Sequence, residues 1–207
     1  MPNSSPIAAW KSLREGNERF VAGKQLHPSQ GVEYRAQLVN AQHPTAVLFG
    51  CGDSRVAAEI IFDQGLGDMF VVRTAGHVID SSVLGSIEYG VHILDVPLIV
   101  ILGHDGCGAV KAALDAIDHG NIPDGFIRSV VERVTPSILK GRNEGLSTVD
   151  ELETRHVIET GSLLMQRSRI INDRIKDGKL AIAGVTYKLA DGQVQLHGSV
   201  GDIGEVV

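Results

Sequence analysis

Two short stretches of this chain place metal-ligating side chains at close spacing. Cys51, Asp53 and Arg55 alternate in the first stretch, GCGDSR, and His104 and Cys107 lie in the second, GHDGCG. Two thiolates and one imidazole can fill three positions of a tetrahedral zinc ion, and a catalytic zinc keeps the fourth position for water or substrate. Because the chain has no third cysteine, we predict one open Cys₂His zinc site per chain.

The carboxylate of Asp53 could serve this centre in two ways. Paired with the always-charged Arg55, it can only accept a hydrogen bond, so it would orient an oxygen bound to the metal. If its link to Arg55 breaks, the carboxylate could itself become the fourth ligand in a closed, inactive state. Hydroxide must then displace Asp53, and we therefore expect any activity to rise with pH.

The elements around these stretches have the pattern of a parallel sheet. Apolar runs at 45–50, 69–74 and 97–103 are too short for helices, and helical stretches at 56–67 and 81–94 separate them. Runs that are apolar on both faces are typical of parallel strands covered by helices. The carboxyl ends of parallel strands share one edge of the sheet, which would bring the two motifs together.

The rest of the chain completes the prediction of an α/β fold. An amphipathic helix begins at Ser5 and Pro6 and stops at Gly23, and an Asp-Gly turn near the C-terminus predicts a hairpin. We predict a single domain with a central, mostly parallel β-sheet, an antiparallel edge strand, flanking helices and an N-terminal helical arm. In this interpretation residues 1–42 form the arm and residues 43–207 the α/β zinc core. The further expected helices lie at 32–41, 108–120, 125–141 and 147–176, and the hairpin strands at 179–189 and 194–201.

Composition excludes several classes of partner. The 207 residues carry a formal net charge of −6 with no basic block, which argues against nucleic acid or an anionic membrane surface. No apolar run approaches the length that spans a bilayer, and the N-terminus has no leader pattern. We therefore expect a cytoplasmic protein that binds neither nucleic acid nor membranes, in which Cys51 and Cys107 do not form a structural disulfide.

Taken together, these motifs resemble the β-class carbonic anhydrases. The resemblance rests on C-x-D-x-R, FVVRTAG, GSIEYG and the H-x-x-C-G loop, and it covers nearly the whole chain. It implies that Cys51, His104 and Cys107 bind Zn²⁺ and that Asp53 and Arg55 form a catalytic dyad. It also implies the reversible hydration of CO₂ to bicarbonate and a proton by zinc-bound hydroxide.

The resemblance implies a substrate pocket and an assembly as well. Gln42, Phe70, Tyr89 and Gly108 match residues that contact CO₂ or bicarbonate in members of the family. In that family the pocket lies at a dimer interface and takes some residues from the neighbouring chain, which implies a homodimer or a tetramer of dimers. We expect Trp10 and the opening helix to pack on that partner.

Other positions that could serve the site are interpreted as structural. Some bacterial members of the family have a regulatory bicarbonate site built with a tryptophan, but Leu48 occupies that position here. Arg73 and Tyr187 match the rest of that site and, without the indole, are interpreted as structural. The histidines at positions 77, 156 and 197 are also interpreted as structural, although His77 is a conceivable proton relay.

Two other functions remain open at this point. The same ligands could serve an enzyme that hydrolyses a related small molecule, such as carbon disulfide or carbonyl sulfide. A non-enzymatic zinc or thiol-redox module would need a closed site or a C-x-x-C pair, and the sequence shows neither. Substitution of Asp53 by Asn would separate an enzyme, which loses turnover and keeps zinc, from a purely structural site.

Overall fold

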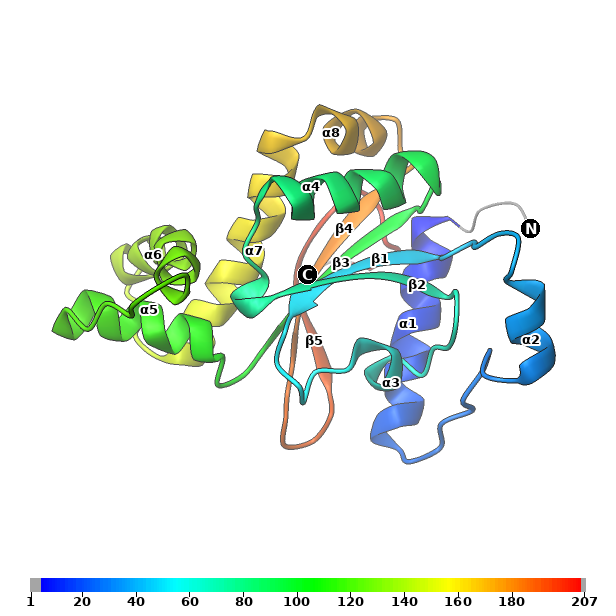
Figure 1. Ribbon diagram of the computed structural model, residues 1–207, viewed down its shortest axis with the longest axis horizontal. Coiled ribbons are helices and arrows are strands. Elements are labelled where there is room, and N and C mark those ends of the chain that lie inside the picture. Colours follow the sequence, from blue (N-terminus) through cyan, green and yellow to red (C-terminus); the bar gives the residue numbers. More distant parts are fainter. Residues whose placement is uncertain (1–4, 206–207) are drawn as a thin grey trace.

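A computed structural model describes residues 5–205 of the chain. Residues 1–4, the first of the expected arm, and residues 206–207 lie outside this range. Its centre is a five-stranded sheet in the order β2-β1-β3-β4-β5, in which only β5 runs antiparallel to its neighbour. The predicted fold class is therefore confirmed (Figure 1). The strands are β1 Ala46–Cys51, β2 Met69–Thr74, β3 Leu98–His104, β4 Ala181–Tyr187 and β5 Val194–Val200.

The position of each strand in the sheet follows from its sequence. Every residue of β1, β3 and β4 is buried, as expected for apolar runs covered by helices on both faces. Strands β4 and β5 form the predicted hairpin, and Gly192 at its turn has a φ of 78°, a conformation that glycine adopts without strain. Strand β2 lies at the opposite edge and is only partly buried.

Helices cover both faces of the sheet (Figure 1). One face packs against α1 and α3, and the other packs against α4, α7 and α8. Helices α5 and α6 form a pair at one end of the molecule, against α7. The bounds are α1 Pro6–Val21, α2 Val32–Gln37, α3 Ala58–Ile61, α4 Ser81–Glu88, α5 Gly108–His119, α6 Ile127–Asn143, α7 Val149–Arg167 and α8 Arg169–Lys176. None of the helices in the described range is long and apolar enough to cross a membrane.

The opening helix packs on its own sheet, so the expectation that Trp10 packs on a partner is wrong. Trp10 is 3% exposed within the single chain, and its indole Nε1 donates a hydrogen bond to Glu205 over 2.8 Å. An apolar helix face indicates that something covers it, but the spacing of the residues cannot show which chain does so. Helix α2 and the segments around it stand away from the sheet (Figure 1). The division of the chain at residue 42 stays a prediction.

Several predicted helices have different ends. The helix expected over 56–67 is confined to α3, because Asp63 has a φ of 47° and ends it. The helix expected over 147–176 breaks at Ser168, whose hydroxyl accepts the Ile171 N–H and starts α8. Helix α2 stops four residues early, and α4 continues into a π turn over Tyr89–Ile93. Side-chain caps and tertiary contacts set these ends.

Candidate metal centre

Three side chains from two adjacent strand ends meet at one point. Cys51 is the last residue of β1, His104 is the last residue of β3, and Cys107 directly precedes α5. Because β1 and β3 are parallel neighbours, their carboxyl ends share the same edge of the sheet. The two sulfurs and a nitrogen of the His104 ring all lie within 4.8 Å of one another, and all three residues are buried. The structure therefore brings together the three metal ligands predicted from the sequence.

The imidazole of His104 is oriented as a ligand. Its Nδ1 lies 2.9 Å from the carbonyl oxygen of Asp105, which can only accept, so Nδ1 carries the proton. The other nitrogen, Nε2, is buried and has no hydrogen-bond partner in the described part of the chain. A buried lone pair without a partner costs free energy unless a ligand takes it. The donor set therefore fits a metal ion, and a nitrogen with two sulfurs fits Zn²⁺.

The two thiols share one proton unless a metal replaces it. The hydrogen bond from Cys107 lowers the pKa of Cys51, against the opposing effect of burial. The same hydrogen bond, together with burial, raises the pKa of Cys107. The N–H of Gly76 also donates to the Cys51 sulfur over 3.4 Å, which favours the thiolate. A divalent metal would stabilise both thiolates and release the remaining proton.

Asp53 and Arg55 form the predicted pair beside these ligands. The guanidinium donates from Nε and Nη2 to the two carboxylate oxygens over 2.9 and 2.7 Å, and the Arg55 backbone N–H donates over 2.9 Å. The side-chain hydrogen bond from Arg55 holds the pKa of the Asp53 carboxyl well below its usual range. Asp53 Oδ2 lies 3.9 Å from His104 Nε2. The carboxylate thus stands next to the candidate metal position while Arg55 holds it.

Arg73 and Tyr187 have structural contacts in this chain. Arg73 donates hydrogen bonds to the carbonyl oxygens of Cys51 and Asp53, over 2.9 and 2.6 Å, and so supports the backbone of the motif. Tyr187 is buried and packs against Phe20 with ring centroids 6.5 Å apart. Leu48 is a fully buried core residue. The contacts of Arg73 and Tyr187 agree with their interpretation as structural residues.

The predicted pocket residues do not all reach the metal centre of the same chain. Phe70 and Tyr89 stack with centroids 6.1 Å apart. In the register of the two strands Phe70 pairs with Val47 and not with Cys51, four residues further on, so it lies about 13 Å back along the strand. Within one chain the aromatic pair therefore does not reach the metal ligands, and its place in the pocket stays a prediction.

The other two predicted pocket residues differ in their placement. Gln42 is exposed in the loop before β1. Gly108 is the first residue of α5, immediately after Cys107, and is exposed. N–H groups in the first turn of a helix have no intrahelical acceptor, so this one is available to a ligand. Within one chain, Gly108 is the pocket residue that the structure places beside the metal ligands.

Comparisons with known proteins bear on this site. Residues 46–194 match the protein family described as carbonic anhydrase. The carbonic anhydrase of Mycolicibacterium smegmatis is 68% identical to this chain over 206 residues, which cover 100% of both proteins. The chain belongs to the carbonic anhydrase family.

Solved structures place the enzyme in the β class. The Coccomyxa β-carbonic anhydrase, solved in complex with acetazolamide, is 25% identical, with a TM-score of 0.73 over 90% of this chain and 86% of that chain. A tetrameric β-carbonic anhydrase of Sordaria macrospora shares the fold, with 24% identity and a TM-score of 0.71 over 80% of this chain and 86% of that chain. The family predicted from the sequence motifs is therefore confirmed.

Helix α7 contributes residues to the surroundings of the candidate metal centre that the sequence did not indicate. Glu153 Oε1 accepts the His104 N–H over 3.2 Å, and Asp150 Oδ1 accepts the Gly106 N–H over 2.9 Å. Burial raises the pKa of the Glu153 carboxyl to about 7. The polar residues at 150, 153 and 156 recur every three residues, which indicates one helix face. Only the fold shows that this helix face contacts the backbone at His104 and Gly106.

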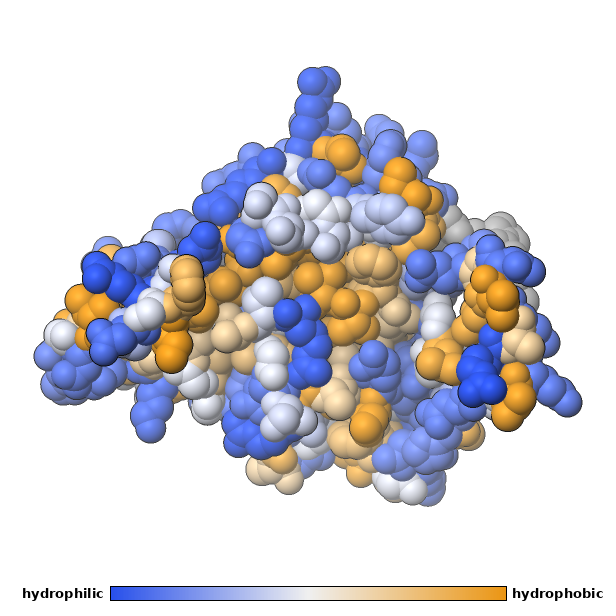
Figure 2. All heavy atoms as spheres, in the orientation of Figure 1, coloured by the Kyte–Doolittle hydropathy of each residue, from blue (hydrophilic) through white to orange (hydrophobic). Residues whose placement is uncertain are grey.

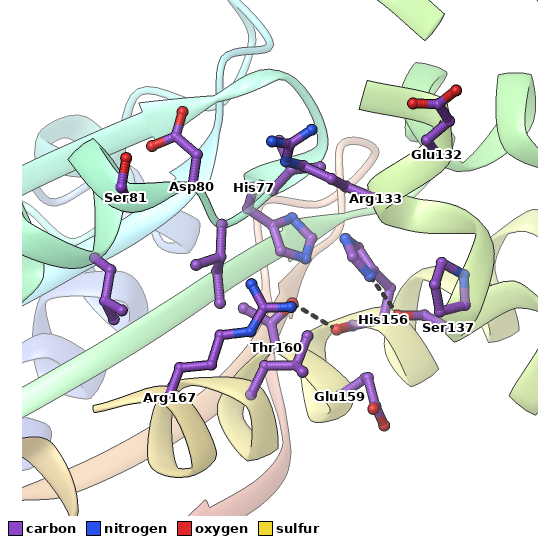
Figure 3. A pocket seen from close by; sticks show the side chains of 15 residues that line it. His77, Asp80, Ser81, Glu132, Arg133, Ser137, His156, Glu159, Thr160 and Arg167 are labelled. Carbon is purple, nitrogen blue, oxygen red and sulfur yellow. Dashed lines mark hydrogen bonds between the residues drawn. The ribbon is translucent and has the colours of Figure 1, made fainter. Parts of the chain in front are cut away.

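A cavity of about 630 Å³ opens between α4, α6 and α7, and none of the three candidate ligands lines it (Figure 3). His77 and His156 lie on its wall with ring centroids 4.4 Å apart. His77 is fully buried, and its ring nitrogens have no hydrogen-bond partner among residues 5–205. Its Nδ1 lies 3.7 Å from Oε1 of Glu153, and its structural interpretation stays a prediction.

Proposed function

We propose that this carbonic anhydrase is a zinc enzyme that hydrates CO₂ reversibly to bicarbonate and a proton. One observation carries the proposal: a buried Cys₂His donor set lies next to a carboxylate that an arginine holds on both oxygens. Cys51, His104 and Cys107 would hold one Zn²⁺ per chain. The metal would supply Lewis acidity, which lowers the pKa of a bound water and makes it a nucleophile.

Asp53 would orient the attacking water. Arg55 keeps the carboxylate ionised, and an ionised carboxylate can only accept a hydrogen bond. A water that donates one proton to Asp53 turns a lone pair away from it, towards the carbon atom of CO₂. The free N–H of Gly108 lies on the same edge of the sheet and is suited to a bicarbonate oxygen.

Asp53 would also control access to the metal. Its carboxylate lies close enough to the donor set to become the fourth ligand if Arg55 releases it. Two thiolates cancel the charge of Zn²⁺, so the site is a weaker Lewis acid than one with three neutral histidines. Both effects favour the active form at higher pH, and we expect activity to rise from near-neutral to alkaline pH. A flat profile over this range would contradict the switch.

A second copy of the chain would complete the pocket. Strand β2 is an apolar edge strand, and edge strands of this kind are sites of pairing with another chain. Tyr89 is 48% exposed and Ile93 is 60% exposed beside it. Apolar side chains gather on this face below α4 and again over α2 (Figure 2). We propose a homodimer or a tetramer of dimers in which Gln42, Phe70 and Tyr89 of one copy serve the neighbouring site.

The Asp53→Asn variant tests the role of the dyad. It should retain zinc, because none of the three metal ligands is changed, and lose CO₂ hydration by about 100-fold, since the amide can donate where the carboxylate only accepts. Stopped-flow hydration and zinc content are measured on the same samples, and Asp115→Asn, an exposed carboxylate on α5, is the matched control. Full activity in Asp53→Asn would rule out this mechanism.

A cytoplasmic location stays a prediction.

A further inference from the structure

Glu153 is a fully buried carboxylate that the proposed mechanism does not use. Its Oε1 accepts the backbone N–H of His104, and its Oε2 has no hydrogen-bond partner in the described part of the chain. A Cβ atom at Gly103 would stand 2.5 Å from Oε1, so the end of β3 packs directly on the carboxylate. A buried polar atom without a partner lowers stability, and an apolar residue that only filled the space would not have this cost.

His156 lies one helical turn beyond Glu153 and supports the other half of the centre. The Ser137 hydroxyl lies 2.8 Å from its Nδ1 (Figure 3). The carbonyl oxygen of Gly76 lies 2.9 Å from its Nε2. Because the carbonyl can only accept, Nε2 carries the proton and Nδ1 accepts from the hydroxyl. His156 therefore fixes the turn whose N–H hydrogen-bonds to the Cys51 sulfur.

The turn at Gly76 needs such support. Gly76 has a φ of 60°, and a Cβ atom there would stand 2.5 Å from the Cβ of Ala109, so no other residue fits without movement. Glycine also has the largest conformational freedom in the unfolded chain, so the fold must hold this position by its neighbours. Hydrogen bonds at both ends of the residue, from His156 and to Cys51, do so.

We propose that Glu153 and His156 are positioning residues of the metal centre, which act together from one face of α7. Glu153 fixes the backbone that carries His104, and His156 fixes the turn that hydrogen-bonds to Cys51. One rigid helix thereby sets the distance between a ligand on β3 and a ligand on β1. The inference rests on the proposed zinc site. Residues that support metal ligands in this way typically change metal affinity or activity by about 10- to 100-fold when they are replaced.

Two substitutions at Glu153 separate positioning from packing. Glu153→Gln keeps the size and the acceptor oxygen, whereas Glu153→Leu keeps the size and removes the acceptor. Zinc affinity is measured by competition with a chelator, and the d–d absorption of the Co²⁺-substituted protein reports the ligand geometry. We expect Glu153→Leu to bind zinc about 10- to 100-fold more weakly with an altered Co²⁺ spectrum, and Glu153→Gln to stay within about threefold of the parent.

Glu159 provides the matched control on the same helix. Its carboxylate is also buried, but its ion-pair partners are Lys140 and Arg155, which are not ligands of the candidate metal centre. Glu159→Leu should lower the unfolding free energy while zinc affinity and the Co²⁺ spectrum stay unchanged. His156→Gln, in which the amide can still donate to Gly76, should resemble the parent protein, and His156→Leu should shift the spectrum.

The outcomes distinguish this inference from the proposed function. If the parent chain binds no zinc, the proposed metal site itself is wrong. If the parent binds zinc and Glu153→Leu binds it equally well with the parent spectrum, positioning by Glu153 is overturned. If Glu153→Leu and Glu159→Leu weaken zinc binding equally, the effect is one of general stability, and the inference is overturned as well. Should Glu153→Leu not fold, the pair His156→Gln and His156→Leu decides by the same readouts.

Discussion

In the proposed mechanism Asp53 pairs either with Arg55 or with the metal, and this choice would govern access to the fourth metal position. The structure shows its carboxylate on the guanidinium of Arg55, 3.9 Å from the unpartnered nitrogen of His104. The pairing is forked, with two separate N–H donors on two oxygens. A point charge at position 55 could not reproduce it, because only a guanidinium has that geometry.

The Arg55→Lys variant tests this geometry at the residue scale. Loss of the fork frees Asp53 to approach the metal, so we expect hydration activity at pH 7 to fall by about tenfold or more. The loss should shrink at alkaline pH, where hydroxide displaces the carboxylate, and zinc content should not change. The measurement is a stopped-flow pH profile with Arg128→Lys as control, since Arg128 pairs with Glu132 on the surface of α6. Equal losses at all pH values would contradict the switch.

His156 makes a second prediction at this scale, for stability in acid. Burial lowers its pKa to about 4, so between pH 6.5 and 4 the unfolded chain binds a proton that the folded chain does not. The free energy of unfolding should therefore decrease as the pH is lowered from 6.5 towards 4, by about 2 kcal/mol at pH 5. Glu153 acts in the opposite direction, because its pKa is raised to about 7. We therefore compare the unfolding free energy of the parent with that of His156→Gln, by urea unfolding at pH 7 and at pH 5. If this difference is the same at both pH values, the lowered pKa of His156 is refuted.

At the scale of elements, α1 is fixed by a close approach to α3. A Cβ atom at Gly16 would stand 1.8 Å from the carbonyl oxygen of Phe62, which is backbone and cannot turn away. Gly85 in α4 has nothing within 4 Å of such an atom. Packing therefore requires a glycine at position 16 but not at position 85.

The same substitution should have opposite effects at these two sites. Gly16→Ala is expected to lower the free energy of unfolding by about 2 kcal/mol or more, because α1 must move off α3. Gly85→Ala should raise it by about 0.5–1 kcal/mol, the ordinary helix preference of Ala over Gly. Urea unfolding of both variants decides, and a stabilising Gly16→Ala would show that the two helices do not touch as described.

The elements also show what the sequence can and cannot predict about the site. Cys51, His104 and Cys107 follow apolar runs that the sequence marks as parallel strands, so their meeting could be predicted. Glu153 lies 49 residues beyond His104, and no local pattern connects the two. Such contacts depend on how α7 crosses the sheet, which only the tertiary structure decides.

At the scale of the whole molecule, the exposed apolar face at β2 and the π turn predicts an assembly. Ile93→Asp would place a charge in the proposed interface and should weaken association by about tenfold or more. Hydration activity should fall with the loss of the partner's pocket residues, while zinc content stays constant. Sedimentation velocity measures the assembly, and Gln166→Asp on the exposed side of α7 is the control. A parent chain that is monomeric and fully active would exclude a shared pocket.

Burial of Trp10 shows a limit of sequence analysis at this scale. Its amphipathic helix was expected on a neighbouring chain, yet it packs on the sheet of its own chain. The pattern of apolar residues measures how much surface is covered, and it carries no information on which chain covers it. The half-buried edge strand β2, in contrast, remains uncovered in the single chain.

The central claim is that the Cys₂His cluster binds zinc and that this zinc site hydrates CO₂. The most direct measurement is zinc per chain together with stopped-flow CO₂ hydration on the same purified sample, at near-neutral and at alkaline pH. The account predicts one zinc per chain and hydration that rises at the higher pH and is lost with the metal. A chain that carries one zinc and hydrates no CO₂ at either pH would contradict it.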